Sequence, residues 1–117
     1  MKYELENVKP AEIEKKSFEI ITEELGNTKL QPGTELIVKR CIHTSADFDY
    51  AENLCFSENV VEKAVQALKE GACIVTDTQM AKAGINKRVL SSFGGEVFCF
   101  MSDEDVAKEA KEKGSTR

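Results

Sequence analysis

Arg40 and His43 are the residues whose types and spacing are best suited to chemistry. His43 is the only histidine among 117 residues, and Arg40 precedes it by three positions. On a helix, side chains three apart share one face, so a guanidinium and an imidazole would point at the same ligand. Imidazole exchanges a proton near neutral pH, which suits an acidic substrate that must be protonated. A structural explanation is also open, because both cations lie near the end of a predicted helix, where the helix dipole favours positive charge.

Ser17 is the second candidate. It follows Ile13 by four positions and precedes Ile20 by three and Ile21 by four. This spacing places its hydroxyl on the apolar stripe of a predicted helix, facing inward. The hydroxyl would either contact a ligand or bond back to the carbonyl four residues earlier.

Polar residues that follow predicted strands form the third group of candidates. Asp77 and Thr78 follow one such strand, and Ser102 and Asp103 follow another. Ligands of parallel sheets bind beyond the carboxyl ends of the strands, which makes Asp77 and Thr78 candidate substrate-binding residues. Capping of the helices that come next explains these residues equally well.

These candidates must be positioned by alternating strands and helices. The alternation predicts an α/β fold with a parallel sheet flanked by helices, in a Rossmann-like three-layer arrangement. The length suits a single domain over residues 1–117. The predicted helices cover residues 10–25, 31–43, 57–68 and 78–83. Ser57 is expected to cap the third of these helices and Asp77 the fourth. A last helix is expected to begin at Ser102 or Asp103 and to end at Gly114. The predicted strands cover residues 72–76 and 96–101, with 54–56 as a possible third, while 44–50 is a polar loop and 89–95 a helix end or turn.

Composition narrows the class of protein. The formal net charge of −5 and the sequence pI near 5.0 argue against a nucleic-acid or anionic-membrane surface. Residues 1–6 are polar and the apolar runs are far too short to span a bilayer, so we expect a cytoplasmic protein with neither a signal peptide nor a membrane partner. The glycine signatures of nucleotide-binding loops are absent.

Four widely spaced cysteines are expected to be reduced thiols, half-buried in the core, rather than a disulfide framework or a zinc site. With one histidine and no paired cysteines, we predict no metal site. The four residues are Cys41, Cys55, Cys73 and Cys99.

Five ordered stretches of the chain carry a resemblance. They are residues 17–21, residues 40–43, Phe56-Ser57 with the helix after it, the spaced set Gly71, Ala72, Ile74, Asp77, Met80 and Gly84, and the set Gly114, Thr116 and Arg117. Together they resemble the precorrin-8X methylmutase family of cobalamin biosynthesis, which the anaerobic branch calls cobalt-precorrin-8 methylmutase. Members of this family are about twice as long, so we expect the chain to correspond to the N-terminal half and to be truncated on its C-terminal side.

The resemblance implies a cofactor-free isomerase that moves a methyl group from C-11 to C-12 of a tetrapyrrole (corrin) precursor. It implies that His43 is the acid that protonates the macrocycle. It also implies that Ser17, Arg40 and Arg117 bind the substrate's carboxylates, and that the protein is a homodimer. Two other readings of the chain remain open: a corrinoid-binding module without catalysis, and a structural α/β domain without a ligand.

Overall fold

The computed structural model describes residues 4 and 6–117, which divide into two compact units, the first ending at Glu58 and the second beginning at Asn59. Part of the polar N-terminal stretch considered above, residues 1–3 and 5, lies outside the described residues. The single domain over residues 1–117 stays a prediction. In the described part of the chain, none of the helices combines the length and the apolar character needed to cross a bilayer.

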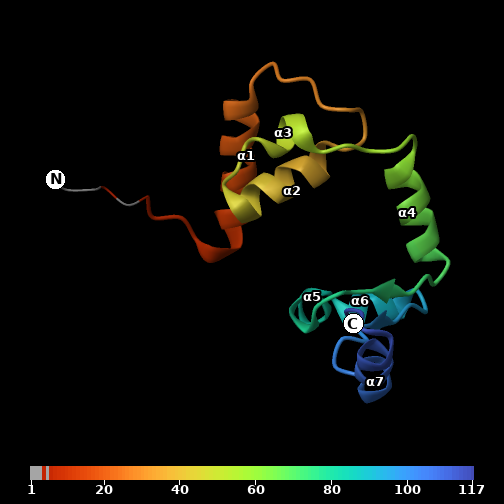
Figure 1. The fold of residues 1–117 in the computed structure, drawn as a ribbon. Helices are drawn as coiled ribbons and strands as arrows, with labels where there is room; N and C mark the ends of the chain where they lie inside the picture. The colour runs from red at the N-terminus through yellow and green to blue at the C-terminus, as the bar shows by residue number, and fades with distance from the viewer. Residues whose placement is uncertain (1–3, 5) are drawn as a thin grey trace. The chain divides into compact units, whose positions relative to one another are not determined.

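The first unit is built from helices. They are the short 3-10 helix η1 (Pro10–Glu12), α1 (Ile13–Leu25), α2 (Glu35–Ser45) and α3 (Tyr50–Asn53). Figure 1 shows α1 and α2 crossing next to each other, with α3 alongside. Their contact is the core of the unit, where Ile21 from α1 meets Val38 and Ile42 from α2, all three buried.

The helix predicted over residues 10–25 is confirmed, with Pro10 opening its first turn as expected. Gly26 ends it with φ of 53°, a left-handed value that glycine adopts without strain. The next helix begins four residues later than predicted. Pro32 and Gly33 form a turn instead, with Gly33 at φ of 85°, and the buried Thr34 hydroxyl donates to the Gln31 carbonyl at 2.6 Å.

The segment after α2 differs from the prediction in two ways. The helix continues through Ser45, and α3 begins at Tyr50, the last residue of the predicted loop, so the polar loop is shorter. The Asp47 carboxylate accepts a bond from the Asp49 backbone N–H at 2.9 Å and helps turn the chain into α3. The possible strand at 54–56 is wrong, because this stretch pairs with no strand among the described residues; Leu54 and Phe56 pack against the helical core instead.

The second unit carries the sheet. It contains α4 (Val60–Lys69), β1 (Ile74–Val75), α5 (Gln79–Gly84), α6 (Lys87–Ser92), β2 (Val97–Phe98) and α7 (Glu104–Lys113). The strands are parallel, with Ile74 opposite Val97 and Val75 opposite Phe98, which confirms the predicted α/β class. Both strands are shorter than the predicted 72–76 and 96–101, because the bonded ladder covers only these two residue pairs.

Two predicted helix caps of this unit are wrong. Ser57 does not begin α4; Asn59 precedes that helix in a left-handed conformation with φ of 56°. Asp77 does not cap α5; the hydroxyl of Thr78 does, accepting a bond from the Ala81 N–H at 3.1 Å. Because Thr and Asp are both good capping residues and stand next to each other here, the sequence alone did not separate them.

The four cysteines are free thiols, as expected, but their burial differs from the prediction. Cys99 is buried and Cys41 is partly buried, whereas Cys55 and Cys73 are exposed. The exposed pair lies just outside the regular elements, in the extended stretch after α3 and the stretch before β1.

Gly95 is expected to tolerate no side chain. It is buried between α6 and β2, and a Cβ there would lie 2.7 Å from the Ala72 carbonyl oxygen and 2.9 Å from Leu90 Cδ1. We expect Gly95→Ala to lower the free energy of unfolding by about 1–3 kcal/mol, the usual cost of overpacking. Gly84→Ala is the matched control, because a Cβ at this position would have none of the described residues' atoms crowding it within 4 Å. Urea unfolding followed by circular dichroism measures both variants, and equal midpoints would contradict the prediction.

Candidate functional site

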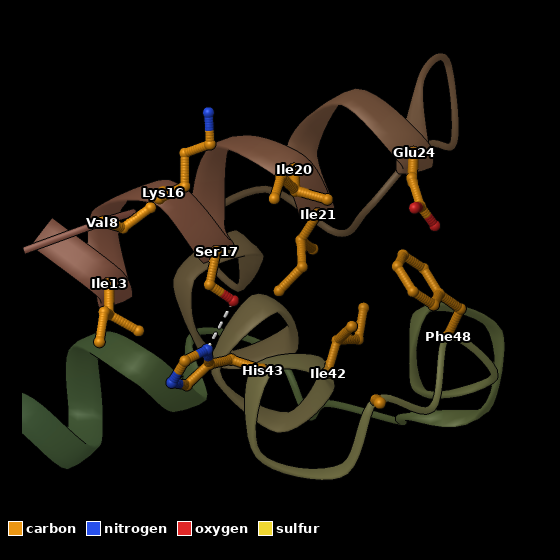
Figure 2. A pocket seen from close by; sticks show the side chains of 11 residues that line it. Val8, Ile13, Lys16, Ser17, Ile20, Ile21, Glu24, Ile42, His43 and Phe48 are labelled. Atoms are coloured by element: carbon orange, nitrogen blue, oxygen red, sulfur yellow. Dashed lines mark hydrogen bonds between the residues drawn. The ribbon is translucent and has the colours of Figure 1, made fainter. Parts of the chain in front are cut away.

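Ser17 and His43 meet across the two main helices of the first unit. The Ser17 hydroxyl on α1 lies 2.7 Å from Nδ1 of His43 on α2, and both side chains are half-buried (Figure 2). The inward position predicted for Ser17 is therefore confirmed. Its partner is a side chain of the other helix, rather than the carbonyl four residues earlier.

The Ser17–His43 pair lies in the wall of a pocket. The pocket has a volume of about 340 Å³, within the range of small-molecule sites. Most of its wall is apolar and comes from α1, α2 and the segments next to them: Val8, Ile13, Ile20, Ile21, Ile42 and Phe48. Its charged members are Lys16 and Glu24, both on α1. Such a wall suits the flat apolar face of an organic ring, with His43 as a polar group directed at it.

Arg40 contacts side chains of α1 and does not line the pocket that His43 lines. Its Nη2 donates to Glu14 Oε1 on α1 at 2.7 Å, and its guanidinium stacks on the ring of Phe18, 5.0 Å from the centroid. The Phe18 ring also contacts His43, with 5.7 Å between the ring centroids. Arg40 and His43 thus share a face of α2, as predicted, but the group they share is Phe18. Arg40 is not part of the pocket wall, and its role in substrate binding stays a prediction.

The Glu14–Arg40 pair links α1 to α2 in a pH-dependent way. Arg40 lowers the pKa of the Glu14 carboxyl, first through the hydrogen bond and then through its charge. The folded chain therefore binds this proton more weakly than the unfolded chain. The contribution to stability is present above the ordinary pKa of a glutamate and is lost as the pH falls through the lowered value. Both side chains are exposed, so the contribution is small.

The bond to Ser17 determines which nitrogen of His43 can act on a ligand. Nδ1 is occupied by the Ser17 hydroxyl, and Nε2 lies on the other side of the ring. A hydroxyl can donate to a neutral Nδ1 or accept from a protonated one. Ser17 can therefore stay bonded to His43 before and after a proton leaves Nε2.

The remaining candidates lie in the second unit. Asp77 and Arg117 line a pocket of about 270 Å³, together with Val75 and Phe100 from the strand region. One N–H of Arg117 donates to the Met101 carbonyl at 3.2 Å. Thr78 caps α5 and is not part of this pocket wall. Of the predicted site residues, the structure thus brings together Asp77 and Arg117 in one unit, and Ser17 and the predicted acid His43 in the other.

Sequence reasoning missed four residues of the site region: Glu14, Phe18, Lys16 and Glu24. A signal for the last two was present. Lys16 and Glu24 follow Ile13 and Ile20 at spacings of three and four, the spacing that places side chains on one face of a helix. Glu14 and Phe18 carried no comparable signal, because their partners lie on α2.

A model of the precorrin-8X methylmutase family matches residues 12–117. A cobalt-precorrin-8 methylmutase of Salmonella typhimurium is 44% identical over 113 residues, covering 92% of this chain and 54% of that protein. One from Priestia megaterium is 41% identical over 110 residues, covering 94% of this chain and 49% of that protein.

A solved structure gives the same result for the fold. The precorrin-8X methylmutase of Thermus thermophilus matches with a TM-score of 0.74 at 34% identity, covering 88% of this chain and 57% of that one. The chain spans about half the length of the curated relatives that it matches. The resemblance inferred from five short stretches is confirmed over most of the chain, and the chain belongs to the precorrin-8X methylmutase family.

Proposed function

We propose that this chain acts in cobalamin biosynthesis as the methylmutase that converts precorrin-8X or cobalt-precorrin-8 into hydrogenobyrinate or cobyrinate. The reaction moves one methyl group from C-11 to C-12 of the macrocycle. The observation that carries the proposal is the Ser17–His43 pair in the wall of an apolar pocket, in a chain of this family. A cytoplasmic location and a homodimer are part of the same proposal.

His43 supplies the acid in this proposal. A 1,5-sigmatropic methyl shift has no leaving group and no change in oxidation state, so the protein must hold the ring and make it more electrophilic. Protonation of a ring nitrogen by Nε2 of His43 does this, and the proton can return after the shift. Ser17 keeps the imidazole oriented in both protonation states through its bond to Nδ1. The methyl group, its electrons and the proton all stay within the complex, so no cofactor is required.

The second pocket is proposed to hold carboxylates of the substrate. Arg117 uses one N–H donor on the Met101 carbonyl, and a guanidinium has five. It can therefore still bind a carboxylate with two parallel hydrogen bonds. Asp77 beside it would select against a second anion, and Thr78 keeps its capping role. Arg40 likewise uses one donor on Glu14, so its remaining donors can bind a carboxylate while that ion pair stays in place.

A binding experiment tests this proposal. We expect hydrogenobyrinate, the metal-free product, to give a saturable absorbance change with the wild-type chain. Ile20→Glu places a carboxylate in the pocket wall, and we expect it to weaken binding at least about tenfold, since burying a charge against an apolar ring is costly. Ile37→Glu is the matched control: Ile37 is 40% exposed against 43% for Ile20, and it lies outside this pocket.

Two results would contradict the proposal. One is the absence of saturable binding by the wild-type chain. The other is an equal loss of affinity in Ile20→Glu and Ile37→Glu. A chain that binds through the pocket but never isomerises the substrate would instead support the corrinoid-binding module, which the relatives, named as methylmutases, do not favour.

A further inference from the structure

We propose that Lys16 and Glu24 set the orientation in which an acidic macrocycle enters the His43 pocket. In this arrangement a carboxylate of the ring lies at the Lys16 end, and the edge with the fewest carboxylates lies at the Glu24 end. The inference rests on the proposed function for its ligand. It goes beyond that function by naming two specificity-determining residues that the sequence did not single out.

The two charges lie at opposite ends of one wall. Both residues belong to α1 and line the pocket, eight positions apart, a separation of about 12 Å along a helix axis. In Figure 2, Lys16 lies near Val8 with its ammonium directed away from Ser17 and His43, whereas Glu24 lies above Phe48. The wall between them is apolar, so a ring seated there meets a cation at one end and an anion at the other.

Lys16 is better placed than Arg40 to bind a carboxylate at this pocket. Its ammonium is 3.8 Å from Glu6 Oε2, with both side chains exposed, which is a loose ion pair. Arg40 is held by Glu14 at 2.7 Å and stacked on Phe18, outside the pocket wall. A lysine has a flexible stem and a compact charge, so Lys16 can exchange Glu6 for a ligand carboxylate at little cost.

Orientation matters because the chemistry takes place at one edge of the ring. A macrocycle with acid groups around its periphery can enter an apolar pocket by several edges, and only one edge brings the reacting carbons near His43. Attraction at Lys16 favours the productive entry, and repulsion at Glu24 disfavours the entry that would place a carboxylate there. A specific site commonly combines an attractive and a repulsive element in this way.

Charge-matched variants of neighbouring residues test the inference. Lys16→Gln and Lys15→Gln change the net charge equally, as do Glu24→Gln and Glu23→Gln. Lys15 and Glu23 lie on α1 beside the tested residues but line a different groove. The probes are hydrogenobyrinate and its fully methylated ester, which has the same ring without the negative charges. Affinities are measured by absorbance at low ionic strength, where exposed charges are least screened.

We expect Lys16→Gln to weaken hydrogenobyrinate binding about threefold to fivefold, as for one exposed ion pair. We expect Glu24→Gln to strengthen it about twofold, by removing a repulsion of similar origin. The two neighbouring controls should leave the affinity nearly unchanged, and the ester should respond to none of the four substitutions.

Three outcomes overturn the inference. The first is that Lys16→Gln and Lys15→Gln weaken binding equally, which would assign the effect to net charge. The second is that the ester responds to Lys16→Gln as strongly as the acid does, which would assign it to packing. The third is a wild-type chain that binds neither probe, which contradicts the proposed function as well; the first two leave that function intact.

Discussion

Replacing His43 with glutamine is expected to slow the methyl shift by about 10² to 10⁴, the usual contribution of a general acid. A glutamine side chain can still bond to Ser17 and fill the pocket wall, but it cannot donate a proton as an acid. Affinity for hydrogenobyrinate should therefore change little. Product formation followed by absorbance gives the rate, and titration of the same variant gives the affinity.

Ser17→Ala provides the companion measurement. Removing the hydroxyl leaves Nδ1 of His43 without its 2.7 Å partner, so the imidazole loses its fixed orientation. We expect a loss of rate in the wild-type background and almost none in the His43→Gln background, because residues that act as a unit are not additive. If Ser17→Ala lowered the rate by the same factor in the wild-type and His43→Gln backgrounds, Ser17 would act on the substrate directly. A full rate in His43→Gln would remove His43 from the chemistry.

Replacing Ile42 with alanine is expected to have the largest effect on stability. Ile42 is 1% exposed and packs against Ile21 and Val38 at the contact between α1 and α2. Truncating a buried isoleucine to alanine typically costs about 2–5 kcal/mol, from lost transfer energy and the cavity left behind. Because the same contact aligns Ser17 with His43, the variant should also lose affinity for hydrogenobyrinate.

Ile37→Ala is the control for this variant, since Ile37 belongs to the same helix and is 40% exposed. Urea unfolding followed by circular dichroism should give a much lower midpoint for Ile42→Ala than for Ile37→Ala, with similar slopes. Equal midpoints would mean that the α1–α2 contact is not the core of the first unit.

The sequence predicted α1 and the inward direction of Ser17 because both depend on spacing within one helix. It could not predict that Ser17 meets His43, since the two residues are 26 positions apart and only the crossing of α1 and α2 brings them together. The same limit applies to Arg40. Its position three before His43 predicted a shared face, but the carboxylate of Glu14 that binds it comes from the other helix.

The second unit shows where local patterns mislead. The apolar run around Ile74 predicted a strand and its parallel pairing correctly. The run is longer than the strand, because Ala72 and Cys73 precede the first paired residue, Ile74. Thr78 and Asp77 are both capping residue types, with Asp the more favoured, so only the backbone geometry decides that Thr78 caps α5. The family, in contrast, was predictable, because five ordered stretches carry more information than any one of them.

The most direct test of the account uses the single histidine of the chain. In protein prepared without a histidine tag, the ¹⁵N and ¹³C signals of the histidine ring come from His43 alone. We expect hydrogenobyrinate to shift these signals at the concentrations that saturate the absorbance change, with Nε2 affected more than Nδ1. Histidine signals that stay unchanged while the corrin binds would place the ligand elsewhere and contradict the role proposed for His43.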